Sequence, residues 1–577
     1  MEQIKNKTRV LKTFTFVFLC ATLTFLCVCG ASARTIYVPD DYEKIQWAVD
    51  SASDGDTIVV RDGTYYENIV VNKHLTIKSE NGSDNCIVNG GSSTVFTLEA
   101  DGIRIEGFTI TGGRYGIHIR SNENSISNNN ISSNNLNGIY LWYSNNNSIS
   151  NNNISNNWAG IWLEDSNNNS ISNNTISSNN FDGLYLWDSN ENTIRKNEFV
   201  NDGLFVGYSY RNIVEDNKVN GKPLIYLEDE SDKIIDNAGQ VILVKCKNIT
   251  VMNAELTNTD VGIELLQSDN CLISNNNISS NNEGGIELWY SNNNSVSNNI
   301  ISSNNEGGIE LWYSNNNSIS NNNISSNNLN GIYLWYSNNN SISENIISSN
   351  GIGIYLEDSN NNGISNNNIS NNYYGIELWF SNNNSILNNI ISNNWYGIIL
   401  PHRSNKNSIS NNIICSNNDD GIHLEDSNNN SISNNNISNN RDGIFLLSSS
   451  NNIIYLNNFI NNTYNAYSYD STNIWNSTEK ITYIYKSSIF TNYLGNYWSD
   501  YTGYDADRDG IGDTAYSVCC TLDKDYHPLM EKFENYISPA DSPPVVDTFS
   551  VTPSEITVGE SFTISYSVSD DKGLERV

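Results

Sequence analysis

Gly-Ile and Gly-Leu steps recur through most of this chain at a nearly constant interval of 22 to 24 residues. They lie at Gly116, Gly138, Gly160 and Gly183, and after an interruption at Gly262, Gly285, Gly308, Gly331, Gly353, Gly375, Gly397, Gly421 and Gly443. A fixed short period indicates a solenoid, in which each repeat buries its apolar side only against its neighbours.

The repeat that starts at Gly138 reads GIYLWYSNNNSISNNNISNNWA. Its apolar residues form three short groups, around Ile139, Ile149 and Ile154, separated by Asn- and Ser-rich turns. Alternation over a few residues indicates strands, whereas a helical repeat needs about ten residues at period 3.6. The sequence therefore predicts an all-β fold, a right-handed parallel β-helix with three short strands in each coil of about 22 residues.

The composition agrees with stacked coils. Only 37% of the residues are hydrophobic and 16% are charged, because Asn and Ser fill much of the chain. Equivalent residues of successive coils stack about 4.8 Å apart, and Asn suits a turn column because it tolerates left-handed φ and its amide both donates and accepts. Motifs such as Asn146-Asn147-Ser148 and Asn153-Ile154-Ser155 are also glycosylation sequons.

The net charge of −34 makes a nucleic-acid partner implausible, because such a chain is repelled by phosphate. At the N-terminus, basic residues precede an apolar run over 14–28, and Ala31-Ser32-Ala33 offers a cleavage site. The run is shorter than the roughly 20 residues that span a bilayer. We therefore expect a signal peptide cleaved near Ala33, no integral membrane span in the mature chain, and a secreted or cell-surface location.

Shifts in composition divide the chain. An amphipathic capping helix with Ile45, Ala48 and Val49 on one side is expected before a first strand at Thr57–Val60. The segment after the C-terminal linker alternates like strands of an Ig-like sandwich but is too short for one, which suggests that the chain is cut short. The expected parts are a signal peptide (1–33), N-terminal cap (34–57), two β-helix parts (58–220 and 221–460), C-terminal cap (461–532), linker (533–545) and an incomplete Ig-like sandwich (546–577).

Several motifs outside the coils resemble the NosD-like β-helix proteins. They are DDYEKIQWAVDSASDGDTIVVRDGTYYENI, VNGKPLIYLED, AGQVILVKCKNITV and GNYWSDYTGYDADRDGIGD, in this order between Thr35 and Met530. The resemblance implies a pectin-lyase-like fold of the archaeal cell-surface type. That family is called periplasmic copper-binding, but copper is bound by clustered thiolate, thioether or imidazole ligands. The chain has only scattered Met and His, so we expect no copper; these residues are Met1, Met252, Met530, His74, His118, His402, His423 and His527.

A column of aromatic residues follows the Gly steps. The fourth residue after the Gly is Trp at Trp142, Trp187, Trp289, Trp312, Trp335 and Trp379, and the second is often Tyr or Glu, as at Glu287, Glu310 and Glu377. Both positions are expected to point outward. Exposed aromatic surface of this size favours a partner, and rows of rings flanked by carboxylates suit carbohydrate. The alternative is that the rings stack only on one another and stabilise the coil.

Two polar clusters interrupt the repeat. The first spans 402–442 and includes Asp419, Asp420, His423 and Arg441, a set that could cleave or epimerise a polysaccharide or could simply be solvated. The second is the loop Asp505, Asp507, Asp509 and Asp513, whose spacing around Gly510 fits structural calcium.

The sequence therefore favours a secreted surface protein that binds polysaccharide or cell-envelope components without catalysis. One alternative is a polysaccharide lyase, glycoside hydrolase or epimerase that uses the 402–442 cluster. The other is a structural spacer or adhesin.

Overall fold

The computed structural model describes residues 33–519, 523–536, 545–552 and 563–569, the last two ranges by their backbone alone. The expected signal peptide lies outside these residues. The chain forms two compact units, one of residues up to 198 with 211–214, the other of 199–210 and the residues from 215 onward. Among the described residues, no helix is both long and apolar enough to cross a bilayer.

The first unit is a parallel β-helix. Its coils are built like the one formed by β13 (Asn137–Trp142), β14 (Ser148–Ser150) and β15 (Asn153–Ser155). Each strand pairs in parallel with its equivalent one coil away, so that Ile139, Ile149 and Ile154 stack in inner columns and are fully buried. The three short strands predicted for each repeat are therefore confirmed.

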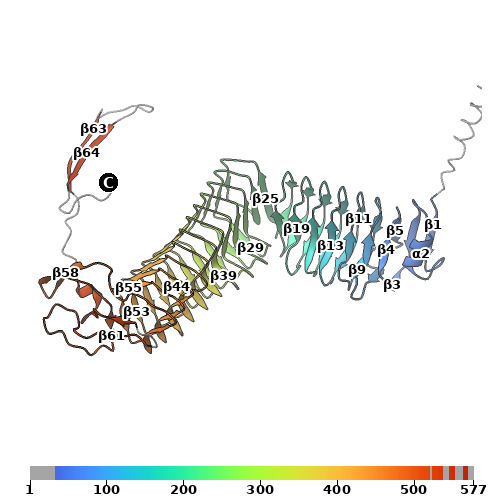
Figure 1. Cartoon of the computed structure of the whole chain (residues 1–577). Helices are drawn as coiled ribbons and strands as arrows, with labels where there is room; N and C mark the ends of the chain where they lie inside the picture. Colours follow the sequence, from blue (N-terminus) through green and yellow to red (C-terminus); the bar gives the residue numbers. More distant parts are fainter. Residues whose placement is uncertain (1–32, 520–522, 537–544, 553–562, 570–577) are drawn as a thin grey trace, which may run out of the picture. The chain divides into compact units, whose positions relative to one another are not determined.

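The second unit has the same construction (Figure 1). Its first sheet runs from β25 (Lys222–Glu228) to β57 (Tyr464–Tyr469), and the other two run from β26 (Ile234–Ile235) to β55 (Ile453–Tyr455) and from β29 (Glu255–Thr257) to β60 (Tyr497–Trp498). The first sheet carries the candidate sites. The strands that matter are β33 (Ile286–Trp289), β36 (Ile309–Trp312), β39 (Asn330–Trp335), β42 (Ile352–Glu357), β45 (Tyr374–Trp379), β48 (Tyr396–Leu400), β51 (Asp420–Glu425) and β54 (Asp442–Leu447).

Buried Asn residues connect successive turns, as the composition suggested. The side-chain amide of Asn322 donates to Asn345 Oδ1 at 3.0 Å and to the Val296 carbonyl at 2.9 Å. Its Oδ1 accepts the backbone N–H of Asn299 at 2.9 Å and the Asn299 side-chain amide at 3.0 Å. The amide thereby satisfies polar groups of both neighbouring coils, which is why the turns hold so many Asn.

Not every Asn of a coil is buried in this way. Asn146 and Asn153, the acceptor positions of the two sequons, are exposed, whereas Asn147 between them is buried and its amide donates to Asn169 Oδ1 of the next coil at 3.0 Å. Asn146 also adopts a φ of 58°, in the left-handed region that Asn tolerates. The sequons therefore present their acceptor side chains to solvent.

At the N-terminal end, the first strand lies earlier in the chain than expected. A strand, β1 (Thr35–Val38), precedes the helix and pairs with β2 (Thr57–Val60), so Thr57–Val60 is not the first strand. The helix α2 (Ile45–Ser51) buries Ile45, Ala48 and Val49 as predicted.

At the C-terminal end, the short helix η1 (Phe533–Asn535) and the following Tyr536 pack on the cap, because Tyr536 stacks on Tyr485. The first residues of the expected linker, 533–536, therefore pack against residues of the expected C-terminal cap. Beyond them, β63 (Val545–Thr552) and β64 (Thr563–Ser569) pair antiparallel, and the rest of the expected Ig-like segment lies outside the described residues.

Candidate functional site

The predicted Trp column is present in the second unit. The strand register aligns Trp289 with Trp312, Trp312 with Trp335, Trp335 with Glu357, and Glu357 with Trp379. All four Trp side chains are half-buried at the end of their strands. Glu357 thus interrupts the column for one coil.

A second aromatic column, which the sequence reasoning missed, lies beside the first. It consists of the residue directly after each Trp: Tyr290, Tyr313, Tyr336 and Phe380. These residues have φ between 46° and 52°, so the backbone turns and the inward-outward alternation of the strand no longer applies to them. The rings of Tyr290, Tyr313 and Tyr336 stack with centroids 5.0 and 5.2 Å apart. Aromatic residues repeated at this turn position were the available signal.

Much of this aromatic surface stacks on itself. The rings of Trp289 and Trp312 are parallel within 2° with centroids 4.8 Å apart, so each covers a face of the other. Trp335 is different, because its ring is turned by 73° relative to Trp312. Trp379 has His402 against its ring at 4.6 Å. Stacking on a parallel Trp ring therefore explains the packing of Trp289 and Trp312. It does not explain the packing of Trp335 and Trp379, which lie on either side of Glu357 in the column.

The interruption at Glu357 and Asp358 leaves aromatic rings uncovered. Glu357 accepts hydrogen bonds from the hydroxyls of Tyr333 at 2.8 Å and Tyr355 at 3.2 Å. On the coil before it, Tyr336 is 42% exposed, and on the coil after it, Phe380 is 41% exposed. Coils lie about 4.8 Å apart, so the two aromatic pairs are about two such steps apart, with carboxylates between them.

The first unit carries the other two predicted Trp residues. The register places Trp142 and Trp187 in one column with Glu164 between them. The side chain of Trp142 is 39% exposed, and the Arg120 guanidinium lies 5.2 Å from the centroid of its ring. Trp187 lies parallel to Tyr185 within 6°. This column is shorter, and a cation already occupies one face of its most exposed ring.

The Glu residues of the second position alternate with the inward Ile and Leu, as predicted, but they are not exposed to solvent. Glu287, Glu310 and Glu377 are only 4 to 6% exposed. Glu287 accepts the indole N–H of Trp289 at 3.0 Å, and the segment around β22 (Leu204–Gly207) lies against this face, where the Val206 N–H donates to Glu264 at 3.1 Å. Burial raises the pKa of Glu287 and of Glu377 to about 7, and it raises the pKa of Glu264 and Glu310 as well.

These buried carboxyls predict an unusual pH dependence of stability. The native state holds more protons than the unfolded chain between pH 4.5 and about 7, so the free energy of unfolding should fall as the pH rises through this range. Glu287→Gln should remove roughly 1 to 3 kcal/mol of this fall, measured as the melting temperature against pH. The exposed Glu344→Gln is the control. An unchanged slope in Glu287→Gln would contradict the prediction.

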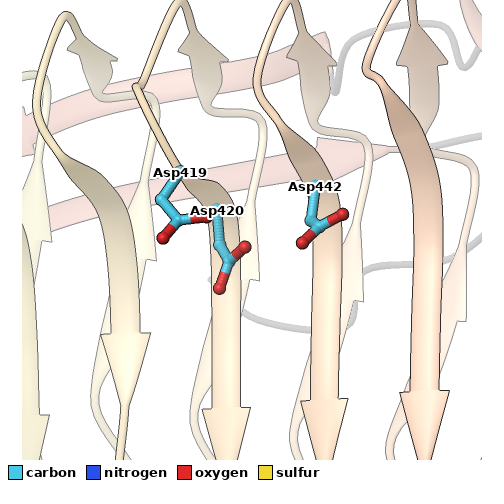
Figure 2. Close-up of side chains that lie close together, drawn as sticks. All are labelled: Asp419, Asp420 and Asp442. Atoms are coloured by element: carbon cyan, nitrogen blue, oxygen red, sulfur yellow. The ribbon is translucent and has the colours of Figure 1, made fainter.

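Three aspartates of the 402–442 cluster come together where two strands begin: Asp419 directly precedes β51, and Asp420 and Asp442 are the first residues of β51 and β54 (Figure 2). One carboxylate oxygen from each of Asp419, Asp420 and Asp442 lies within 4.8 Å of the others. Register pairs Asp420 with Asp442 on adjacent strands. The 22-residue period thus places two acidic side chains in one column.

Two of the predicted basic residues contact this cluster. His423 Nδ1 is 2.7 Å from Asp420 Oδ2, and the Arg441 guanidinium is 2.6 Å from Asp419 and 3.4 Å from Asp442. Burial and the nearby Asp420 carboxylate raise the pKa of Asp442 to about 6. The predicted grouping of Asp419, Asp420, His423 and Arg441 is therefore seen, whereas His402 packs on Trp379 instead.

A cavity of about 360 Å³ adjoins the cluster. Arg441 and Asp442 line it together with Phe445, Tyr464, Tyr467 and Cys519. The rings of Phe445 and Tyr467, which both line the cavity, stack at 5.0 Å, and His423 stacks on Phe445 at 4.8 Å. The sequence analysis did not single out Phe445 and Tyr467. Both lie in the column of the second residue after each Gly step, where Tyr and Glu are frequent.

The Asp-rich loop has a compact arrangement of three of its four predicted residues. Oxygens of Asp505, Asp507 and Asp509 lie within 4.8 Å of one another, whereas Asp513 accepts the Ala506 N–H at 2.8 Å. Backbone N–H groups of 510 and 511 also donate to this loop's carboxylates.

Calcium at this loop stays a prediction. Excess EDTA should lower the melting temperature, and Asp507→Asn should remove the part of that effect which arises here. An identical EDTA response of wild type and Asp507→Asn would count against a calcium ion in the loop.

The donor groups do not fit copper. Within the described ranges, the groups of three or more His, Cys, Asp or Glu donors close enough to hold one ion consist only of aspartates. Copper prefers imidazole, thiolate or thioether ligands. The expectation that this chain holds no copper stays a prediction.

The chain is similar to two protein families, to one curated protein and to several solved structures. The family model described as right handed beta helix region matches residues 239–391. A cell surface glycoprotein of Methanothermus fervidus is 41% identical over 109 residues, which make up 18% of this chain and 18% of that protein. Among solved structures, the A-module of the Azotobacter vinelandii mannuronan C-5 epimerase AlgE6 is 14% identical, covering 74% of this chain and 92% of its own, with a TM-score of 0.34.

An alginate lyase from a Paenibacillus species is 15% identical, with 55% of this chain and 95% of its own covered and a TM-score of 0.22. The family model described as periplasmic copper-binding protein (NosD) matches residues 49–221 and 330–503, and these two ranges make up more than half of the chain. With its coils of three parallel strands, this protein is a right-handed parallel β-helix that belongs to the NosD family.

Proposed function

We propose that this chain is a cell-surface β-helix protein that binds carbohydrate of the cell envelope without chemically changing it. The proposed binding surface, called the aromatic face here, consists of Trp335, Tyr336, Trp379 and Phe380 on either side of the Glu357–Asp358 coil. The observation that carries the proposal is that these aromatic pairs bracket a coil with carboxylates and are not covered by parallel aromatic neighbours on that side.

The chemistry of sugars fits such a surface. A sugar ring has an apolar C–H face, which packs on an aromatic ring, and a rim of hydroxyls, which donate to carboxylate oxygens. Exposed aromatic side chains gathered on a soluble protein generally mark a binding surface. The stacked Trp289 and Trp312 would hold the neighbouring coils rigid, so that the aromatic face is already formed before a ligand arrives.

Two similarities support the surface location. The relative that matches 109 residues is a cell surface glycoprotein, and the matching family is described as a periplasmic protein. The signal-like segment at residues 1–33 agrees with this location.

The proposal is tested by retention of the purified chain on a panel of immobilised polysaccharides, with neutral and acidic members. Wild type should be retained by at least one of them. Trp335→Ala/Trp379→Ala should reduce retention about tenfold or more, as loss of two central aromatic contacts does in other interfaces. The matched control is Trp395→Ala. Trp395 lies on the same unit and is 45% exposed, but it is not part of the Trp column.

A second candidate is a polysaccharide lyase, hydrolase or epimerase that uses the Asp420–His423 pair. The short Asp420–His423 contact, with Arg441 next to a cavity, favours it. The same panel is then assayed for new reducing ends, unsaturated sugars and changed epimers. Products that disappear in Asp420→Asn would replace binding by catalysis, whereas no retention and no products would leave a structural spacer.

A further inference from the structure

The cluster of Asp419, Asp420 and Asp442 has more negative charge than its surroundings balance. Asp420 and Asp442 are only 4% and 2% exposed. His423 and Arg441 are the basic residues that contact the cluster among the described residues, and the Arg441 side chain is 56% exposed. Burying several carboxylates with one partly solvated guanidinium is costly unless further positive charge is present.

Two oxygens of the cluster have no hydrogen-bond donor. Oδ2 of Asp420 contacts His423 and Oδ2 of Asp442 faces Arg441. In contrast, Oδ1 of Asp420 and Oδ1 of Asp442 are buried and accept no hydrogen bond from any described residue. Buried polar atoms nearly always have a partner, so two orphaned acceptors on adjacent strands indicate a missing ligand.

The geometry suits one ion. An oxygen from each of the three carboxylates lies within 4.8 Å of the others, and side-chain rotation alone can bring them to the separations of about 3 to 4 Å found between oxygens that share one Ca²⁺ at roughly 2.4 Å. A single Ca²⁺ could therefore contact all three without movement of the backbone. Carboxylate oxygens are also the ligands that hard cations prefer.

We propose that Asp419, Asp420 and Asp442 bind one divalent cation of the calcium class at the edge of the cavity lined by Arg441 and Asp442. Calcium takes six to eight oxygen ligands, more than three aspartates supply, so its remaining positions face the cavity and are filled by water or by oxygens of a bound molecule. This site is separate from the Asp505–Asp509 loop and does not depend on carbohydrate binding at the aromatic face.

The test is isothermal titration of the chelator-treated full chain with CaCl₂ alone. The matched set is wild type, Asp442→Asn and Asp507→Asn, where the last removes a carboxylate of the Asp-rich loop. We expect Asp442→Asn to lose one Ca²⁺ per chain relative to wild type, and Asp507→Asn to keep that ion. No Ca²⁺ binding by wild type, or equal stoichiometry and affinity in wild type and Asp442→Asn, would overturn the proposal.

A folding defect is excluded by circular dichroism of each variant and by a second variant, Asp419→Asn. Asp419 is only half-buried, so an Asn side chain at this position should not disturb the coil. The loss of the carboxylate should weaken Ca²⁺ binding at least tenfold. An unchanged affinity in a folded Asp419→Asn would count against a site that needs all three carboxylates. Because no polysaccharide is present, failure here leaves the proposed carbohydrate binding untouched.

Discussion

Asn322→Ala should lower the free energy of unfolding by about 3 to 5 kcal/mol, although it removes only a small polar side chain. The amide of Asn322 makes four hydrogen bonds to two neighbouring coils, and the side chain is 1% exposed. Its loss leaves buried groups of Asn299 and Val296 without their partner, and each such group costs about 1 to 3 kcal/mol.

The control is the next residue, Asn323→Ala, whose side chain is exposed at the start of β38 (Asn323–Ser325). Its effect should stay within about 0.5 kcal/mol. Because solenoids can unfold in parts, urea denaturation followed by Trp fluorescence should be paired with hydrogen exchange of the coils around residue 322. Equal destabilisation by the two substitutions would show that the buried Asn column is not a main source of stability.

Gly331→Ala should lower the free energy of unfolding of the β-helix by about 3 kcal/mol or more, or prevent the chain from accumulating in folded form. A Cβ at this position would lie 2.6 Å from the Gly353 carbonyl oxygen and 2.7 Å from Ile347 Cγ2. The first of these atoms belongs to the backbone of the next coil, so the clash cannot be relieved by a side-chain rotation. This explains why Gly recurs once in every coil.

Gly363→Ala is the matched control, because no atom lies within 4 Å of its Cβ position. It should be neutral or slightly stabilising, since Gly in a strand costs about 0.5 to 1 kcal/mol relative to Ala. Soluble yield and urea midpoints of the two variants measure the difference. A stable Gly331→Ala would mean that the coils can move apart more easily than the parallel pairing suggests.

Local alternation and the repeat period were enough to predict the strands. Ile139 and Leu141 are buried and Trp142 is at the surface because a strand alternates its side chains. The Tyr290–Tyr336 column was missed because these residues follow the strand, where positive φ replaces alternation. The same period, applied to Asp420 and Asp442, is enough to pair them in one column, which the sequence analysis did not do, but it cannot show that two of their oxygens lack donors.

Burial of the Glu column depends on more distant parts of the chain. The residue that donates to Glu264 is Val206, 58 positions away in the sequence. No local pattern announces such a contact, so Glu287 was expected to be exposed. The early strand β1 was missed for a related reason, because its pairing with β2 spans the whole capping helix.

The central claim is that the aromatic face binds a sugar chain. Its most direct test is the dissociation constant of a polysaccharide that retains the wild type, measured by calorimetry for wild type, Trp335→Ala/Trp379→Ala and Trp395→Ala. The dissociation constant should rise about tenfold or more in the double variant and stay unchanged in Trp395→Ala. Equal affinity of all three proteins would contradict the assignment of binding to this face.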